Sequence, residues 1–156
     1  MRTYQHTQKF SWIWFAFGYA LVALVGYAAL NNQTESPISL WIVIGVAILL
    51  FIIQRARLIL YIDKDSIGYR WAPYQKNRVT FSKNQMESLT ITRYPFIGYG
   101  YRVSAKYGTV NNTRGAIGVW IKLQTGDSYL LGVSDVKEVV GALKDNGYEK
   151  IEIRTD

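Results

Sequence analysis

The side chains that most often carry enzyme chemistry are scarce in this chain of 156 residues. His6 is its single histidine and there is no cysteine, which excludes thiolate nucleophiles, disulfides and cysteine-ligated zinc. His6 precedes the first long apolar segment, so we expect it to lie apart from the globular part and to form neither a Ser-His-Asp triad nor a metal site there. Asp63 and Asp65 could pair, but aspartates around a turn are usually turn-forming residues. The sequence therefore predicts no enzymatic activity, no catalytic residue, no cofactor and no bound metal.

Motifs for nucleotides and nucleic acids are incomplete. The glycines at 98 and 100 are not followed by the third glycine of a dinucleotide-binding loop, and no phosphate loop of the Gly-x4-Gly-Lys-Ser/Thr type is present. Residues 98–101 resemble part of the aromatic strand of an RNA-recognition motif. However, Ile97 stands where a basic residue is expected, and Arg102 where an apolar one is expected. A bulge or bend that requires glycine explains the block better, and we expect no nucleic-acid partner.

Two uncharged apolar segments, residues 10–30 and 38–53, fill most of the first third of the chain. As a helix, the first segment spans about 31 Å, close to the roughly 30 Å of a bilayer core. We expect a two-helix transmembrane hairpin over residues 10–54, with helices at about 10–30 and 37–54 and an external loop at 31–36. A cleaved signal peptide would have a shorter apolar region, and helices buried in a soluble protein would carry a polar stripe.

The charges around the apolar segments predict an orientation. Lys9 precedes the first segment, the loop carries only Glu35, and Arg55 and Arg57 follow the second segment. Because basic residues near membrane ends stay in the cytoplasm, we expect a multi-pass protein of the cell membrane with both termini cytoplasmic. Residues 1–9 are then a cytoplasmic N-terminal tail. The candidate contacts with the membrane surface are three snorkelling cations and two interfacial tryptophans: Lys9, Arg55, Arg57, Trp12 and Trp41.

Residues 55–156 predict a cytoplasmic α+β domain. Apolar residues alternate or cluster as in strands at residues 58–62, 67–71, 79–81, 86–94, 99–105, 117–123 and 128–133, so we expect about seven antiparallel strands. The apolar residues from Val136 to Leu143 have helical spacing; Ser134 suits the N-cap and Gly147 the stop. The tail to Ile153 could add a last short strand. This order predicts a bent sheet or open barrel capped by one C-terminal amphipathic helix.

Three blocks carry a resemblance to a known family: RLILYIDKDSIGYRW (57–71), IGYGYRV (97–103) and GVWIKLQTGDSYLLGVSDVKEVVGAL (118–143). With the apolar hairpin, they resemble bacterial membrane proteins that join a transmembrane hairpin to a pleckstrin-homology-like (bPH-like) domain. The resemblance implies a PH-like fold and a membrane setting, and it brings no catalytic residues. Phosphoinositide-binding domains of this kind use a lysine and a later basic-x-Arg pair, and here Lys64 and residues 76–78 match that spacing on successive hairpins.

The leading functional hypothesis is protein interaction or assembly at the membrane. We expect the interaction surface around the aromatic and basic residues Tyr94, Tyr99, Tyr101, Arg102 and Lys106, with strand-edge addition of a peptide as one binding mode. Sensing of anionic lipid by the basic and aromatic face, and a role as accessory subunit of a membrane transport complex, remain alternatives. The expected partners are the bilayer and an unidentified protein, and anionic lipid and a homo-oligomer are compatible with the sequence.

Overall fold

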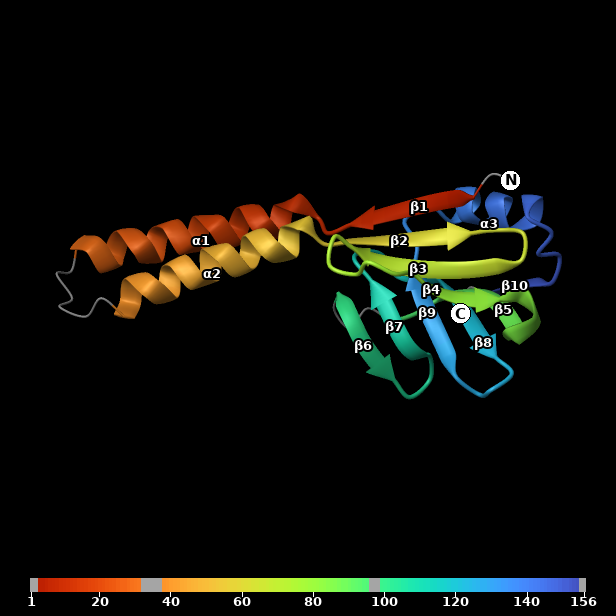
Figure 1. Ribbon diagram of the computed structural model, residues 1–156. Helices are drawn as coiled ribbons and strands as arrows, with labels where there is room; N and C mark the ends of the chain where they lie inside the picture. The colour runs from red at the N-terminus through yellow and green to blue at the C-terminus, as the bar shows by residue number, and fades with distance from the viewer. Residues whose placement is uncertain (1–2, 32–37, 96–98, 155–156) are drawn as a thin grey trace. The chain divides into compact units, whose positions relative to one another are not determined.

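The computed structural model describes residues 3–31, 38–95 and 99–154 (Figure 1). The chain forms two compact units. One is helical and runs from Phe10 to Ala56, and the other is β-rich and combines the residues up to Lys9 with those from Arg57 onward.

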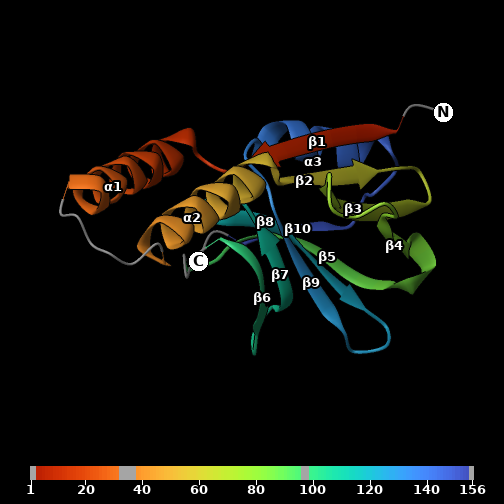
Figure 2. The same cartoon turned by 60° about the vertical axis from the view of Figure 1, so that its left-hand side comes forward.

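The helical unit consists of α1 (Trp12–Asn31) and α2 (Ile38–Arg55), which lie side by side (Figure 2). Glycine allows this close approach: a Cβ placed on Gly18 would lie 3.1 Å from Leu50 Cδ1. The Tyr19 hydroxyl donates a hydrogen bond to Gln54 Oε1 at 3.0 Å across the pair. The predicted loop at 31–36 lies outside the described residues except for Asn31. The predicted start of the second helix at residue 37 also lies outside them.

Within the described segments, α1 is the one helix long and apolar enough to cross a membrane. Only 6% of its most apolar window is buried by the rest of the chain, so α1 is not packed as a core helix. The apolar part of α2, Leu40–Arg55, is shorter. Length and composition therefore support one membrane-spanning helix and are silent on orientation.

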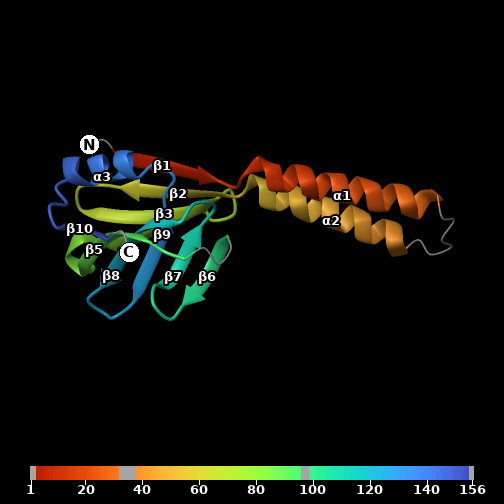
Figure 3. The ribbon, with the colours of Figure 1, turned by 180° about the vertical axis from the view of Figure 1, so that it is seen from behind.

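The β-rich unit contains two sheets. The first has the antiparallel order β1 (Tyr4–Lys9), β2 (Arg57–Ile62), β3 (Ser66–Ala72), β4 (Val79–Ser82). The second has the order β10 (Ile151–Arg154), β5 (Met86–Arg93), β8 (Ile117–Leu123), β9 (Ser128–Gly132), β7 (Gly108–Asn112), β6 (Gly100–Ser104). A short 3-10 helix, η1 (Lys83–Gln85), precedes β5, and α3 (Val136–Asp145) lies beside β1 (Figure 3).

Both sheets and α3 contribute to one main apolar core. Alternate residues of β2 and β8 point into it, and the buried face of α3 closes it; the members include Leu58, Leu60, Val119, Ile121, Val139 and Leu143. A smaller cluster lies on the opposite face of the second sheet: Tyr94, Tyr107, Val110, Trp120 and Leu130. The α+β class is thus confirmed, and the described residues form no closed barrel.

The strand count and pairing differ from the sequence prediction. The seven predicted strands correspond to β2–β6, β8 and β9, and the anticipated last strand is β10. Two strands, β1 and β7, were not predicted. In addition, β10 pairs with β5 and β7 pairs with β9 in parallel, so the prediction of a purely antiparallel arrangement is wrong for the second sheet. The two missed strands lack an apolar alternation because several of their inward-facing residues are polar.

The prediction that residues 1–9 form a tail is wrong for the described residues of that segment. Tyr4–Lys9 pair antiparallel with the whole of β2, from Tyr4 opposite Ile62 to Lys9 opposite Arg57. The helical unit is therefore an insertion in the connection between two neighbouring strands. Only residues 10–11 separate β1 from α1, and only Ala56 separates α2 from β2.

Buried polar side chains hold β1 and β7 in the fold. The Gln8 amide is 1% exposed; its Nε2 donates to the Arg114 carbonyl at 2.8 Å, and its Oε1 accepts from the Thr113 N–H at 3.0 Å. In β7, Asn111 Oδ1 accepts from Trp71 Nε1 at 2.8 Å. Such bonds satisfy main-chain and side-chain groups that burial would otherwise leave without a partner. Polar strands are therefore compatible with this interior.

The start of α3 differs from the prediction. Asp135, not Ser134, is the N-cap, and its Oδ1 accepts from the Glu138 N–H at 2.9 Å. Ser134 instead contacts His6. Gly147 follows the helix with a φ of +78°, which glycine adopts without steric cost, and the Tyr148 N–H bonds back to the Leu143 carbonyl at 3.0 Å.

Replacing Gln8 by leucine should destabilise the β-rich unit. The substitution removes the bond to the Arg114 carbonyl and leaves the buried Thr113 N–H without its acceptor, which costs roughly 1–3 kcal/mol of unfolding free energy. Urea unfolding of the full chain in detergent measures this loss. Gln5→Leu, on the exposed face of the same strand, is the matched control and should change the value by no more than about 0.5 kcal/mol. Equal stabilities for the two variants would contradict the role assigned to the Gln8 amide.

Candidate functional site

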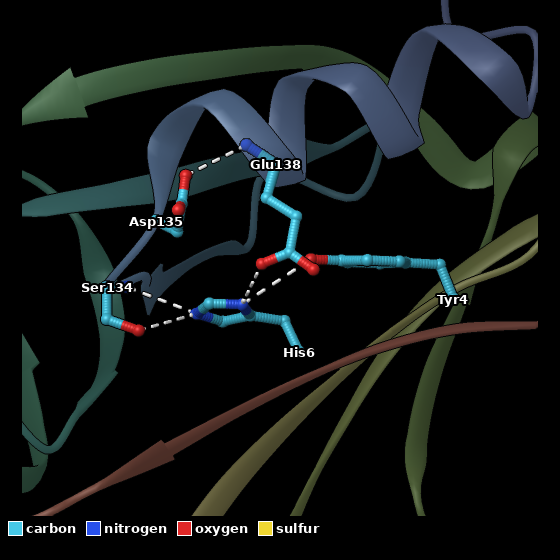
Figure 4. A network of polar contacts seen from close by, with 5 residues as sticks. All are labelled: Tyr4, His6, Ser134, Asp135 and Glu138. Carbon is cyan, nitrogen blue, oxygen red and sulfur yellow. Dashed lines mark hydrogen bonds and ion pairs between the residues drawn. The ribbon is translucent and has the colours of Figure 1, made fainter.

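A polar cluster joins the N-terminal strand to the start of α3 (Figure 4). His6, on β1, is 7% exposed, and its Nε2 lies 3.1 Å from the Ser134 main-chain nitrogen and 3.0 Å from Ser134 Oγ. Its Nδ1 lies 3.5 Å from the Tyr4 hydroxyl and 3.8 Å from Glu138 Oε2. The sequence-based expectation that His6 lies apart from the globular part is therefore wrong, because β1 carries it into the fold.

The hydrogen bonds define the protonation state of His6. A main-chain N–H can only donate, so Nε2 must be the unprotonated acceptor and Nδ1 carries the proton. Burial lowers the pKa of His6 below its ordinary value of 6.5, although Glu138 and Asp135 act in the opposite direction. Burial, reinforced by the hydrogen bond to Glu138, raises the pKa of the Tyr4 hydroxyl. His6 is therefore neutral near pH 7.

The order Ser134, His6, Glu138 resembles a catalytic triad only in residue type. The lone pair of Nε2 that a general base requires already accepts from the Ser134 main-chain N–H. The distance from Nδ1 to Glu138 is also too long for the hydrogen bond that orients a catalytic histidine. This geometry suits a structural link between β1 and the loop before α3.

Acidification should weaken this link. Since the folded-state pKa of His6 is lowered, its stabilising contribution is complete above the unfolded value of 6.5 and is lost as the pH falls through the folded pKa. The free energy of unfolding of the full chain in detergent should therefore fall between pH 7.5 and 5, with a slope of at most about 1.4 kcal/mol per pH unit. His6→Gln keeps an acceptor but does not titrate, so this component should disappear. An unchanged profile in His6→Gln would disprove the assignment.

The second feature with binding potential is the outer edge of the second sheet. β6 is the terminal strand, and in the described part of the chain it pairs only with β7 (Figure 1). Tyr101 and Val103 share one face of β6 and are 66% and 76% exposed. The register with β7 is continuous from Gly100 to Ser104, without a bulge. The devices that usually protect such an edge, namely lysine, proline and bulges, are absent from β6.

The strands around this edge carry only positive charge. Between Glu87 and Asp127 the sequence has no acidic residue, whereas Arg93, Arg102, Lys106, Arg114 and Lys122 are basic. This stretch contains β6, β7 and β8 and nearly all of β5. The charges of the rest of the chain are mixed. The β6, β7, β9 and β8 side of the second sheet therefore presents a one-sign field that favours an anionic partner, whereas Glu87 in β5 and Glu152 in β10 lie toward the other end of the sheet.

The structure divides the predicted interaction residues into two groups. Tyr94 is only 2% exposed, and its hydroxyl accepts from Asn112 Nδ2 at 2.9 Å, so it belongs to the smaller cluster and is not a contact surface. Arg102 lies 3.4 Å from Asn112 Oδ1 and stacks over the Tyr94 ring. Tyr99 and Tyr101 are exposed, and Lys106 is exposed in the connection between β6 and β7. The prediction is therefore wrong for Tyr94, which is a core residue, and for the other four residues it stays a prediction.

Four of the five predicted membrane-surface residues lie where the chain passes between the two units, and Trp41 lies near the start of α2. Trp12 begins α1, and Arg55 ends α2 with its guanidinium 4.6 Å from the centre of the Phe51 ring. Trp41 is an exposed residue of α2. Lys9 and Arg57 are register partners at the ends of β1 and β2. The two cations of the β-rich unit therefore occur where the chain leaves and re-enters that unit.

The lysine and basic-x-Arg pattern is not assembled into one site. Lys64 lies in the turn between β2 and β3, and Lys76 lies in the connection between β3 and β4. Arg78 forms an ion pair with Asp63 at 3.0 Å.

Comparison with models of known protein families, with curated protein sequences and with solved structures found no match for this chain.

Proposed function

We propose that this chain is a non-enzymatic, two-pass membrane protein with a cytoplasmic, PH-like β-rich unit. That unit binds an extended acidic segment of a partner protein by adding it to the outer edge of β6. The observation that carries the proposal is the combination of an edge strand that pairs on one side only, within the described residues, and neighbouring strands β7, β9 and β8 that carry no acidic residue.

The physical basis of the binding mode is the strand edge. An added strand would pair with the outward main-chain N–H and C=O groups of β6, which gives affinity without a specific sequence. The exposed faces of Tyr101 and Val103 would supply apolar contacts on one side. Acidic residues of the segment would approach the neighbouring cations, which increases the association rate and disfavours basic segments.

The membrane setting gives this weak, edge-based binding its efficiency. A partner in the same bilayer meets the unit at a high effective concentration, so a modest intrinsic affinity is enough. The apolar, largely exposed α1 supports membrane insertion, and α2 is the proposed second crossing. The basic residues beside the two helices, Lys9, Arg55 and Arg57, favour the orientation with both termini in the cytoplasm.

The topology can be measured because the chain has no cysteine. A single cysteine at Gln33 should react with a membrane-impermeant thiol reagent in intact cells. A single cysteine at Lys76, an exposed residue of the β-rich unit, should react only after the cells are permeabilised. The reverse pattern would overturn the orientation, and labelling of both positions would overturn the second crossing.

The binding mode can be tested by photo-crosslinking in cells. A benzoylphenylalanine placed at Val103 should crosslink one partner, and the same group at Thr80, exposed on the edge strand β4 of the other sheet, should not capture that partner. The crosslinked segment of the partner should be acidic. A synthetic peptide of that segment should bind the purified full chain in neutral nanodiscs.

Charge substitutions at one position complete the test. Val103→Asp and Val103→Lys both remove the exposed valine, but only the aspartate repels an acidic segment. The affinity of the Val103→Asp variant for the acidic peptide should therefore be about fivefold lower than that of the lysine variant. Equal affinities would contradict the proposed charge complementarity. If Val103 crosslinks lipid and no protein, the alternative of anionic-lipid sensing replaces the proposal.

A further inference from the structure

A cavity of about 510 Å³ lies on the side of the second sheet that carries the smaller aromatic cluster. Its volume falls within the usual range for a small-molecule site. Three cationic side chains line it: Arg93 at the end of β5, Arg154 in β10, and Lys106 from the connection between β6 and β7. Among the described residues, no acidic side chain lines it. Segments far apart in the sequence thus bring three positive charges to one cavity.

The sheet register places the strand ends that carry two of these cations side by side. Arg154 pairs with Thr92 in the parallel β10–β5 ladder, one residue before Arg93. Because side chains alternate along a strand, Arg154 shares its sheet face with Thr92, and Arg93 lines the cavity at the end of β5. Arg154 contacts Glu152 at 2.9 Å, but both side chains are more than half exposed, and such a pair contributes little. Over the described segments, Arg93 and Lys106 form no ion pair.

The apolar part of the cavity is aromatic. Tyr94, Tyr107 and Trp120 line it, and the rings of Tyr107 and Trp120 meet edge to face at 5.3 Å. Trp120 is 8% exposed, and its buried Nε1–H has no hydrogen-bond acceptor in the part of the chain that the structure describes. A buried donor without an acceptor is costly and rare.

We propose that this cavity binds a small organic anion: a flat, preferably aromatic body that carries a phosphate, sulfonate or carboxylate group. The anionic group lies among Arg93, Lys106 and Arg154, and the flat body packs on Tyr107 and Trp120. This site is independent of strand addition at β6, because none of its three aromatic residues is on that strand. A soluble metabolite and a lipid headgroup share this chemistry.

A matched ligand series tests the proposal on the full chain in nanodiscs of phosphatidylcholine. Calorimetric titration should show binding of 1-naphthyl phosphate. Inorganic phosphate lacks the flat body and 1-naphthol lacks the anion, so each should bind at least about tenfold more weakly. Equal binding of 1-naphthol and 1-naphthyl phosphate would overturn the anion site, as would a failure of 1-naphthyl phosphate to bind.

Variants locate the binding in this cavity. Arg93→Gln and Arg154→Gln should each lower the affinity for 1-naphthyl phosphate by about tenfold, because each removes a charge-assisted hydrogen bond. Lys122→Gln is the matched control, because Lys122 lies over the Trp120 ring at 4.5 Å but does not line the cavity. Unchanged affinity in both arginine variants, or an equal loss in Lys122→Gln, would overturn the assignment. The Val103 variants of β6 should bind the naphthyl probe normally.

The Trp120 ring, which lines the cavity, reports ligand binding there independently of the measured affinity. With 5-fluorotryptophan in all five positions, fluorine NMR should show that the ligand shifts the Trp120 signal, assigned by its loss in Trp120→Phe. A shift confined to the other four signals would contradict the site. Repeating the titration in nanodiscs with phosphatidylglycerol identifies the source. Competition by this lipid indicates a headgroup phosphate, and undiminished binding indicates a soluble anion; both results support the site.

Discussion

The fold depends on the pairing of the first described strand with β2, across an insertion of two long helices. Two polar side chains of β1 hold this pairing in place through hydrogen bonds to other parts of the β-rich unit. Gln8 bonds to main-chain groups of residues 113 and 114, and His6 bonds to the main chain of Ser134. Without these contacts, β1 would be a short polar strand attached only along one edge. With them, the residues before the helical unit become part of the β-rich unit.

This arrangement has a consequence for the connection between the two units. An appended domain has one covalent connection to its neighbour, whereas the β-rich unit has two to the helical unit, and they begin at the register partners Lys9 and Arg57. A unit joined in this way has less rotational freedom than one on a single flexible linker.

Polarity is distributed unevenly over the two sheets. The first sheet and its connections carry both signs of charge, including the Arg78–Asp63 ion pair. In the second sheet, four strands lie largely within a stretch of the sequence that has no acidic residue. One field therefore acts on two separate features, an edge strand and an aromatic cavity. Both features favour negatively charged partners for the same electrostatic reason, although one presents main-chain groups and the other side chains.

The sequence alone determined the elements whose signal is local. Uninterrupted apolar composition predicted helices at about residues 10–30 and 37–54, a continuous apolar run predicted β2, alternation predicted β3 and β8, and helical spacing with Gly147 predicted α3 and its end. Only the tertiary structure decided where polar residues are buried. Gln8, His6 and Asn111 read as loop or tail residues, because their partners lie on other elements and no local pattern reveals a satisfied buried amide. For the same reason, Tyr94 was predicted as surface, and the convergence of Arg93, Lys106 and Arg154 could not be foreseen. The proximity of Arg93 and Arg154 is created by a parallel strand pairing between residues about sixty positions apart, and such a pairing leaves no periodicity in the sequence.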